Sequence, residues 1–437
     1  MKATDKNTLS RRNFIKLMAG AGVMLAGGGI LALRKTSMGR DIENHARSLL
    51  HDKQSQYLRQ LITTDNAHSR RIMWQAAEPM KEPLIRLRLK KDTKREMVFP
   101  VQDDSFFDDG ENHIQYSALL DNLAPDTAYE FAIEDGKEQT DWFPVQTADA
   151  TKDDFTMLIF TDSQSSDYSD WRNVAQSAIK RHPEAELFTD LGDLVDNGED
   201  SSQWRAWFGS IEGLIDRIPF VPVMGNHECY NRDWKEQLPM AYLHYFNVPD
   251  NHSNSFNRYY YSFDYGQVHF TVLNTMEREL KNFKDGLMEE QVEWLHKDLS
   301  STKKPWKIVL MHRDVLQYRI ARRPERKEGI SEEGQLFMPI FEQYGVDIVL
   351  TGHLHTYRNR GHIVGESHND KGPLYLLCGL SGNVRYDRLW TSHSLDKVVA
   401  PQPETDNYLT MRVAGNSITI RCFLPDGTQL DEISVTK

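Results

Sequence analysis

The sequence predicts two domains, a small all-β sandwich followed by a larger α/β domain. Short segments that alternate apolar and polar residues fill residues 65–148, whereas apolar runs separated by helical stretches follow from residue 149 onward. The chain has 437 residues, a length that suits two domains. Apolar residues make up 39% of it and aromatic residues 10%, enough to fill two packed cores.

The first 40 residues differ in charge from the rest of the chain. They carry eight Lys or Arg against one acid, a net charge of +7, which leaves −19 on the remainder of a chain whose formal net charge is −12. The overall acidity argues against nucleic acid as a stable partner, because nucleic-acid binding needs a basic face. A basic head on an acidic chain instead indicates a targeting segment.

Residues 1–40 are similar to a bacterial twin-arginine export signal. Residues 10–16 contain the pattern Arg-Arg-x-Phe-Ile-Lys, and residues 17–33 form an uncharged stretch rich in Ala, Gly, Leu and Met. A plain membrane anchor is the alternative, since no clear cleavage site follows. We therefore expect a periplasmic or otherwise extracytoplasmic protein that engages the twin-arginine translocation machinery. It would contact the membrane only through this segment, if the leader is retained.

Residues 41–148 are expected to form a linker and then a sandwich. Residues 41–64 are polar with spaced leucines, which predicts a linking helix. Alternating segments then predict six short strands, at 71–76, 84–89, 97–101, 113–119, 128–133 and 142–146. The run Leu-Ala-Pro-Asp-Thr-Ala-Tyr at 123–129 resembles the tyrosine corner of fibronectin type III-like domains. We therefore predict a fibronectin-like sandwich over residues 65–148.

The second domain, residues 149–437, alternates strands and helices. Apolar runs predict seven strands, at 155–160, 186–188, 220–224, 268–273, 307–311, 347–350 and 374–378. Helices are expected between them, for example at 170–180 and 287–299, so both faces of the sheet would be covered. Residues 408–413 and 417–423 flank Gly415-Asn416 and predict a hairpin that closes one sheet.

Five short polar motifs follow predicted strands of this domain. They are Asp162-Ser163-Gln164, Gly192-Asp193-Leu194-Val195-Asp196, Gly225-Asn226-His227-Glu228, His312 and Gly352-His353-Leu354-His355. Because ligands bind beyond the carboxyl ends of strands in open α/β sheets, these side chains are expected to meet in one crevice. Asp, Asn and His are hard oxygen and nitrogen donors for divalent metals. Two metals about 3.5–4 Å apart can bind a phosphoryl group and activate water.

The order of these motifs resembles the calcineurin-like metallophosphoesterase superfamily. The purple acid phosphatase-like branch is the most similar, since it places a fibronectin-like domain before the catalytic one. The resemblance implies a four-layer α/β/β/α sandwich over residues 149–437 and two divalent metal ions, either Mn, Zn or Fe. It also implies the ligands, namely Asp193 bridging both metals, Asn226, His312 and His353 at one site, and Asp162 and His355 at the other.

The same resemblance implies the catalytic roles. His227 would face the phosphate and stabilise or protonate the leaving-group oxygen, and Glu228 would orient His227 by a hydrogen bond. The nucleophile would be a metal-bound hydroxide, with no covalent enzyme intermediate.

The chain departs from the family pattern at one metal position. The superfamily has histidine where this chain has Gln164, and purple acid phosphatases supply a tyrosinate at the position of Asp196. Either residue, or water, could fill the gap, and glutamine is a weaker ligand than imidazole for a transition metal. Without a tyrosinate we expect a colourless protein with no enforced ferric iron.

The sequence thus predicts an exported hydrolase of phosphoric esters that acts on a phosphorylated small molecule, with monoesters favoured over diesters. A phosphodiesterase or nucleotidase of the same fold is one alternative. A degenerate, non-catalytic surface binding protein is another, in which the metal centre is structural or vestigial. A basic loop after His312 would either guide anions or simply be solvated, the second being favoured; its members are Arg319, Arg322, Arg323, Arg326 and Lys327.

Overall fold

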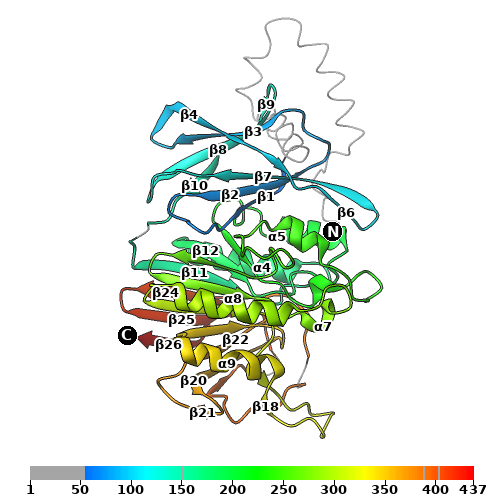
Figure 1. The fold of residues 1–437 in the computed structure, drawn as a ribbon, viewed down its shortest axis with the longest axis vertical. Coiled ribbons are helices and arrows are strands. Elements are labelled where there is room, and N and C mark those ends of the chain that lie inside the picture. The colour runs from blue at the N-terminus through cyan, green and yellow to red at the C-terminus, as the bar shows by residue number, and fades with distance from the viewer. Residues whose placement is uncertain (1–54, 150, 387–388, 402–403) are drawn as a thin grey trace, which may run out of the picture. The chain divides into compact units, whose positions relative to one another are not determined.

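Two large β-sheets packed face to face position the five motifs in the computed structural model (Figure 1). The structure describes residues 55–149, 151–386, 389–401 and 404–437. The expected export signal at 1–40 and most of the expected linker therefore lie outside the described residues. Among the residues that are described, no helix is long and apolar enough to cross a membrane.

The first sheet contains the strands that precede three of the motifs. Its central strands run parallel, and an antiparallel meander continues the sheet from β11. The parallel strands are β11 (Asp154–Phe160), β12 (Ala185–Asp190) and β13 (Phe220–Pro222). The meander consists of β24 (Tyr408–Ala414), β25 (Ser417–Phe423) and β26 (Gln429–Thr436). The predicted hairpin is confirmed, since Ala414 pairs with Ser417 across Gly415-Asn416.

The second sheet carries the strands that precede the histidine motifs. Its order is β14-β15-β16-β19-β22-β20-β21, with β23 beside β20, and its four central strands are parallel. The strands are β14 (Tyr261–Tyr265), β15 (Val268–Leu273), β16 (Trp306–Met311), β19 (Ile348–Thr351), β20 (Thr356–Val364), β21 (Ser367–His368), β22 (Leu374–Gly379) and β23 (Val398–Val399). A separate small ribbon pairs β17 (Leu316–Gln317) with β18 (Gly329–Ile330).

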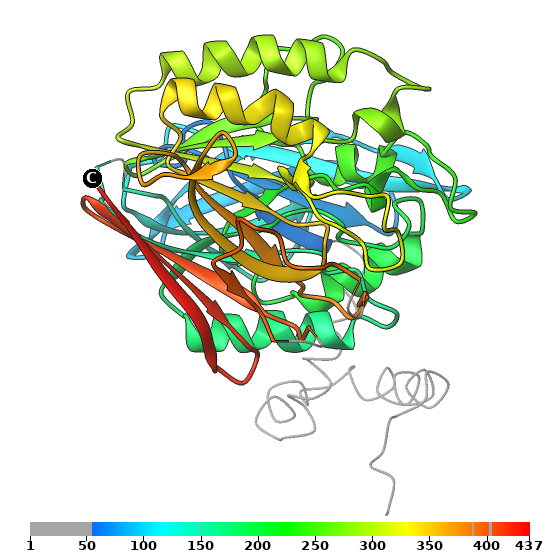
Figure 2. The same cartoon turned by 90° about the horizontal axis from the view of Figure 1, so that it is seen from below.

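Helices cover the outer faces of the two sheets, which confirms the predicted four-layer α/β/β/α order. Figure 2 shows α8 and α9 on one side of the sheets and α4 on the other. The longer helices are α4 (Ser169–Arg181), α5 (Ser201–Ser210), α8 (Leu287–Ser301) and α9 (Glu332–Tyr344). Short helices are η1 (His227–Cys229), α6 (Met240–Tyr245) and α7 (Glu277–Leu280).

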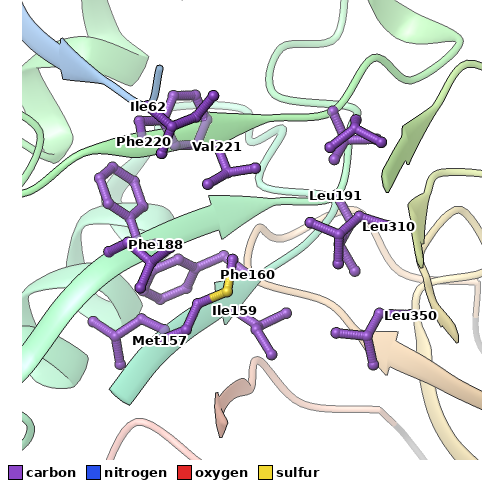
Figure 3. Close-up of a cluster of buried hydrophobic side chains, with 14 of the residues drawn as sticks. Ile62, Met157, Ile159, Phe160, Phe188, Leu191, Phe220, Val221, Leu310 and Leu350 are labelled. Carbon is purple, nitrogen blue, oxygen red and sulfur yellow. The ribbon is translucent and has the colours of Figure 1, made fainter. Parts of the chain in front are cut away.

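The parallel strands are buried on both faces, which explains their continuous apolar runs. Leu310 and Leu350 point into the space between the sheets, where Figure 3 shows them near Ile159 and Phe160 of β11. Their chain neighbours Val309 and Val349 pack instead against α8 and α9. Successive residues of a strand point to opposite faces, so each strand contributes to two cores.

The smaller domain is a β-sandwich with its own core, as predicted. One of its sheets has the order β10-β8-β3-β4, with β9 beside β8. These strands are β3 (Pro83–Leu89), β4 (Asp92–Pro100), β8 (Ala128–Asp135), β9 (Glu138–Gln139) and β10 (Phe143–Gln146). The tyrosine corner is present, because the Ala124 N–H donates a hydrogen bond to the Tyr129 hydroxyl at 2.9 Å.

The other sheet of the sandwich is continuous with the first sheet of the large domain. Its strands are β1 (Gln56–Leu61), β2 (Arg70–Ala76), β5 (Gln102–Asp103), β6 (Phe106–Asp108) and β7 (Glu111–Leu120). β1 joins the domains, because it pairs in parallel with β13 at Leu61 and Phe220 and antiparallel with β2. The predicted helix over residues 41–64 is therefore wrong for the described part, and the sandwich begins before residue 65.

Burial explains why a polar-looking segment forms a strand here. Arg59 is fully buried, yet its guanidinium donates to the carbonyl oxygens of Tyr245 (2.6 Å) and Tyr57 (2.8 Å) and to Gln115 Oε1 (2.7 Å). Gln60 donates to the carbonyl oxygens of Pro144 and Asp216. The polar groups are thus satisfied by partners distant in sequence, which a helical pattern in the sequence cannot reveal.

Candidate metal centre

The motif residues lie just beyond the carboxyl ends of the central strands. Asp162 follows β11, Asp193 follows β12 and Asn226 follows β13 in the first sheet. His312 and His353 follow β16 and β19 in the second sheet. The facing sheets therefore bring all five motifs to one edge of the domain, as the strand-end argument predicts.

Two clusters of ligand atoms form at this edge and share one carboxylate. Asp193, His312 and His353 make up the first cluster, and Asp162, Asp193 and His355 make up the second, with the ligand atoms of each within 4.8 Å of one another. Asn226 belongs beside the first cluster, because its Oδ1 lies 3.3 Å from His312 Nε2. The arrangement places Asp193 where a ligand bridging two cations would stand.

Backbone carbonyl groups fix the orientation of two of the candidate ligand histidines. Nδ1 of His312 donates to the Leu191 carbonyl oxygen at 2.8 Å, and Nδ1 of His355 donates to that of Val384 at 2.5 Å. Each Nε2 is then free to point at a carboxylate, 3.1 Å from Asp193 Oδ2 for His312 and 3.2 Å from Asp162 Oδ1 for His355. Such outer hydrogen bonds set the tautomer and hold a metal ligand in position.

His227 has the same kind of anchor but faces the open side of the centre. Its Nδ1 donates to the carbonyl oxygen of Asp196 at 2.8 Å, and its Nε2 lies 3.8 Å from Asp193 Oδ2. The side chain is 12% exposed, whereas that of Asp193 is 1% exposed. His227 is therefore next to the ligand clusters without belonging to either, which is the place expected for a group that contacts substrate.

The buried charges of the centre compensate one another. Burial would raise the pKa of Asp193, but the imidazoles of His312 and His227 outweigh it and hold that pKa below its usual range. Burial would lower the pKa of His312, yet the carboxylate of Asp193 raises it to about 9. Burial and the neighbouring His312 lower the pKa of His353 far below its ordinary value. A cation bound here would take the place of the proton on His312.

Several ligand residues sit in strained backbone. Asp162, Asp193, His353 and His355 all adopt left-handed conformations, with φ of 51°, 57°, 77° and 52°. Such conformations cost about 1–3 kcal/mol each for ordinary residues and cluster at functional sites. The fold therefore stores strain at the residues that would hold metal.

The motif glycines serve two different purposes. Gly192 turns the chain with φ 101°, in a region that favours glycine. Gly225 and Gly352 instead provide space, since a Cβ would lie 2.2 Å from Asp193 Oδ1 at Gly225 and 2.2 Å from Thr161 Oγ1 at Gly352. A side chain at either position would displace the ligand carboxylate or the residue beside it.

Glu228 does not orient His227, contrary to the sequence-based expectation. Its fully buried carboxylate accepts hydrogen bonds from the backbone N–H groups of Gly225 (2.7 Å), Asp193 (3.0 Å) and Leu194 (2.8 Å). Burial and the nearby charge of Asp193 raise the pKa of Glu228 to about 7. Glu228 thus ties two motif loops together, and the orienting contact of His227 comes from a carbonyl group instead.

Gln164 and Asp196, the two candidates for the metal ligand that this chain lacks relative to the family pattern, lie in different surroundings. Gln164 is buried, and neither Oε1 nor Nε2 of its amide has a hydrogen-bond partner among the described residues. Its backbone N–H donates to the Asp193 carbonyl oxygen at 3.0 Å, so it lies in the same group of loops. Asp196 is in neither ligand cluster and contributes its carbonyl oxygen to His227.

The donor set fits two divalent cations. It consists of carboxylate, amide and imidazole groups, the donors preferred by Mn, Zn and Fe. A buried amide without a partner costs free energy, so Gln164 also fits a ligand position better than a purely structural one.

A cavity of about 400 Å³ opens beside Asn226 and His353. Its charged lining holds three arginines and three glutamates, and Arg313 is paired with Glu279 and Glu333. Of the basic loop, Arg326 lines the cavity, and its Nε donates to the Tyr318 carbonyl oxygen at 2.8 Å. The solvated interpretation fits the other members, which are exposed, namely Arg319, Arg322, Arg323 and Lys327.

Two aromatic residues near the centre were missed by sequence reasoning. The Trp234 ring centroid lies 5.6 Å from that of His227, and the Tyr386 centroid lies 4.8 Å from that of His355. Trp234 is 58% exposed and Tyr386 38% exposed. Only the short distance in sequence between His227 and Trp234 could have drawn attention to the first, and no sequence signal indicates the second.

Two family models match the chain. The calcineurin-like phosphoesterase model matches residues 155–357, and the model of the purple acid phosphatase N-terminal domain matches residues 57–147. The larger domain is therefore a calcineurin-like phosphoesterase domain, and the domain before it is of the type found at the N-terminus of purple acid phosphatases.

Individual relatives agree with this assignment. Purple acid phosphatase 15 of Arabidopsis thaliana is 29% identical over 209 residues, which cover 46% of this chain and 36% of that protein. Fe(3+)-Zn(2+) purple acid phosphatase 12 of the same plant is 25% identical over 328 residues, 68% of this chain and 64% of that protein. The chain spans between 36% and 41% of the length of the first three curated relatives.

A solved structure shares the fold. The purple acid phosphatase PPD1 from yellow lupin (Lupinus luteus) seeds has a TM-score of 0.73 at 17% identity, covering 87% of this chain and 74% of that one. The sandwich followed by the α/β domain is thus the architecture of a known purple acid phosphatase.

Proposed function

We propose that this protein hydrolyses phosphoric monoesters of small molecules at a centre of two divalent metal ions. The observation that carries the proposal is the pair of ligand clusters that share Asp193, with His227 beside them on the open side. When bound, the two cations would polarise the phosphoryl group and lower the pKa of a water molecule to about 7.

The residues of the chain have separate tasks in this proposal. Asp193, Asn226, His312 and His353 would hold one cation, and Asp162, Asp193 and His355, with Gln164, the other. The relative named as an Fe(3+)-Zn(2+) enzyme supports iron and zinc as candidates, alongside manganese. With both ring nitrogens protonated, His227 would keep its Nδ1–H on the Asp196 carbonyl oxygen and give the proton of Nε2 to the leaving-group oxygen.

Metal analysis combined with turnover tests the proposal. Purified protein should contain two metal ions per chain and hydrolyse p-nitrophenyl phosphate faster than bis-p-nitrophenyl phosphate. Faster turnover of the diester would favour a phosphodiesterase. One metal ion or none, with no turnover after addition of manganese, zinc or iron, would refute the proposal and favour a degenerate binding protein.

The role of His227 gives a sharper prediction. His227→Ala should lower kcat by about 10²–10⁴-fold, the usual contribution of a positioned acid, and leave both metal ions bound. The histidine faces the open side without being a member of either ligand cluster, so metal content should not change. His252→Ala, a change at an exposed histidine, is the matched control. Loss of metal in the His227 variant would mean that the residue is a ligand.

We also propose that the protein is exported by the twin-arginine route. The Arg-Arg-x-Phe-Ile-Lys pattern and the apolar stretch after it support this proposal. Replacing Arg11 and Arg12 by lysine should leave the protein in the cytoplasm of a bacterial host, as measured by fractionation. Unchanged export of the variant would contradict the proposal.

A further inference from the structure

Trp234 is an exposed aromatic residue at the rim of the metal centre. Its side chain is 58% exposed, and its ring stands nearly perpendicular to that of His227, at 86°, with centroids 5.6 Å apart. Exposed aromatic residues are ordinary when they are scattered over a surface. This one stands next to the group that would protonate the leaving group, so its surroundings decide what it does.

The backbone holds Trp234 in a conformation that a bulky residue rarely adopts. Its φ is +60°, in the left-handed region, which costs free energy for a residue with a Cβ. Hydrogen bonds keep it there: the Trp234 N–H donates to the Asn231 carbonyl oxygen at 2.9 Å, and Asn231 Oδ1 accepts from the Lys235 N–H at 2.9 Å. These hydrogen bonds fix the backbone position from which the indole projects.

The same loop is fastened to the segment that positions His227. Asn197 Nδ2 donates to the Asn231 carbonyl oxygen at 2.8 Å, and Glu199 Oε2 accepts from the Arg232 N–H at 2.9 Å. Asn197 directly follows Asp196, whose carbonyl oxygen holds His227. Hydrogen bonds within the chain thus hold the backbone at Trp234 and the imidazole of His227 in place relative to each other.

A second ring extends this surface toward the cavity. The Tyr230 ring centroid lies 5.7 Å from that of His227 and 6.3 Å from that of Trp234. Tyr230 also lines the cavity of about 400 Å³ together with Asn226 and His353. Two aromatic rings therefore flank His227 on the side where the alcohol part of a bound ester would leave.

We propose that Trp234 and Tyr230 form a stacking platform for a planar ring in the alcohol part of the phosphate ester. The inference rests on the proposed function, because it places the leaving-group oxygen at His227. An aryl or nucleoside group attached to that oxygen would meet the indole, whereas a glycerol or sugar group has no π system for aromatic stacking. The platform therefore selects esters that carry an aromatic ring.

Binding of two phosphonates to the metal-loaded protein tests the platform without any turnover. Phenylphosphonate should bind about tenfold tighter than methylphosphonate by calorimetry, the size of one aromatic stacking contact. Trp234→Ala should abolish this preference and leave methylphosphonate affinity within about twofold, while Trp234→Phe should keep most of it. Phe283→Ala, at an aromatic residue that is 49% exposed, is the matched control and should change nothing.

Two outcomes would overturn the inference. If Trp234→Ala keeps the phenyl preference, the indole does not contact the ring. If it weakens both phosphonates equally, the indole serves His227 or the metal centre instead. A protein that turned over no ester would refute the proposed function, yet the phosphonate preference would still decide whether the platform exists.

Turnover measurements then show whether the ring belongs to an aryl group or to a nucleoside. The substrate pairs are phenyl phosphate with glycerol 3-phosphate, and adenosine 5′-monophosphate with ribose 5-phosphate. Trp234→Ala should raise KM about five- to tenfold for the ring-bearing member of at least one pair, with kcat nearly unchanged. A change in the first pair identifies an aryl group and a change in the second a nucleoside, while no change in either pair overturns the inference.

Discussion

Some side chains at the metal centre lower the stability of the metal-free protein, and the effect should be measurable by mutation. Gln164 is the clearest case. Its buried amide has no partner among the described residues, so it destabilises the metal-free protein. Gln164→Leu, which keeps the volume, should raise the free energy of unfolding of metal-free protein by about 1–2 kcal/mol. The loaded variant should lose one metal ion by elemental analysis. Retention of both ions would show that Gln164 is not a ligand.

His269 gives a pH-dependent prediction away from the metal centre. Burial lowers its pKa, but Asp264 (2.8 Å) and Asp298 (3.0 Å) accept from its two ring nitrogens and raise the pKa to about 9. The folded pKa therefore lies above the unfolded value, about 6.5. The imidazolium then contributes its full stability below about pH 6.5 and loses it as the pH rises through 9.

His269→Asn should accordingly lower the free energy of unfolding by about 2 kcal/mol at pH 6 and by much less at pH 10, measured with denaturant. His252→Asn, at an exposed histidine, should have no such effect at either pH. An equal loss at both pH values would mean that packing rather than charge holds His269.

At the level of elements, the loops after β12 and β13 depend on one carboxylate. Glu228 accepts hydrogen bonds from four backbone N–H groups, and glutamine would direct an NH₂ group at one or more of these donors. Glu228→Gln should therefore cost about 1–3 kcal/mol of stability and lower metal affinity, measured by denaturation and metal titration. Glu290→Gln is the control, because its partners are the hydroxyl groups of Ser253 and Tyr260, which can turn to accept. Equal effects of both variants would contradict this role.

The sequence predicted the elements that obey local rules. β11, β16 and β19 are apolar runs buried on both faces, and their ends locate Asp162, His312 and His353 without structural knowledge. β1 escaped prediction because its buried Arg59 and Gln60 are satisfied by carbonyl groups far along the chain.

The features of the metal centre that the sequence did not predict depend on backbone geometry. The partners of Glu228 are backbone N–H groups, which no side-chain pattern encodes. The presentation of Trp234 depends on a left-handed φ and on hydrogen bonds of Asn231, neither of which is visible in a sequence. The motifs therefore identified the candidate ligands. The hydrogen bonds that hold the ligand loops, and the aromatic residue at the rim of the site, could be found only in the structure.

At the level of the molecule, the continuous sheet joins the sandwich to the large domain. β1 lies between β13 and β2, and Arg59 donates to Tyr245 of α6. The described residues should therefore unfold in one cooperative transition by calorimetry. A fragment of residues 149–437 should be insoluble, because it exposes the edge of β13 and an apolar surface. Two separate transitions, or a soluble fragment that binds metal, would contradict this prediction.

The left-handed backbone at Asp162, Asp193, His353 and His355 also bears on how this protein can evolve or be engineered. Glycine would relax the backbone at each of these positions, so selection for thermal tolerance alone favours losing the ligands. Activity and robustness are thus opposed at the same four residues. A lineage released from the need for catalysis would be expected to lose its metal-binding residues first and keep its fold, becoming a stable scaffold without chemistry.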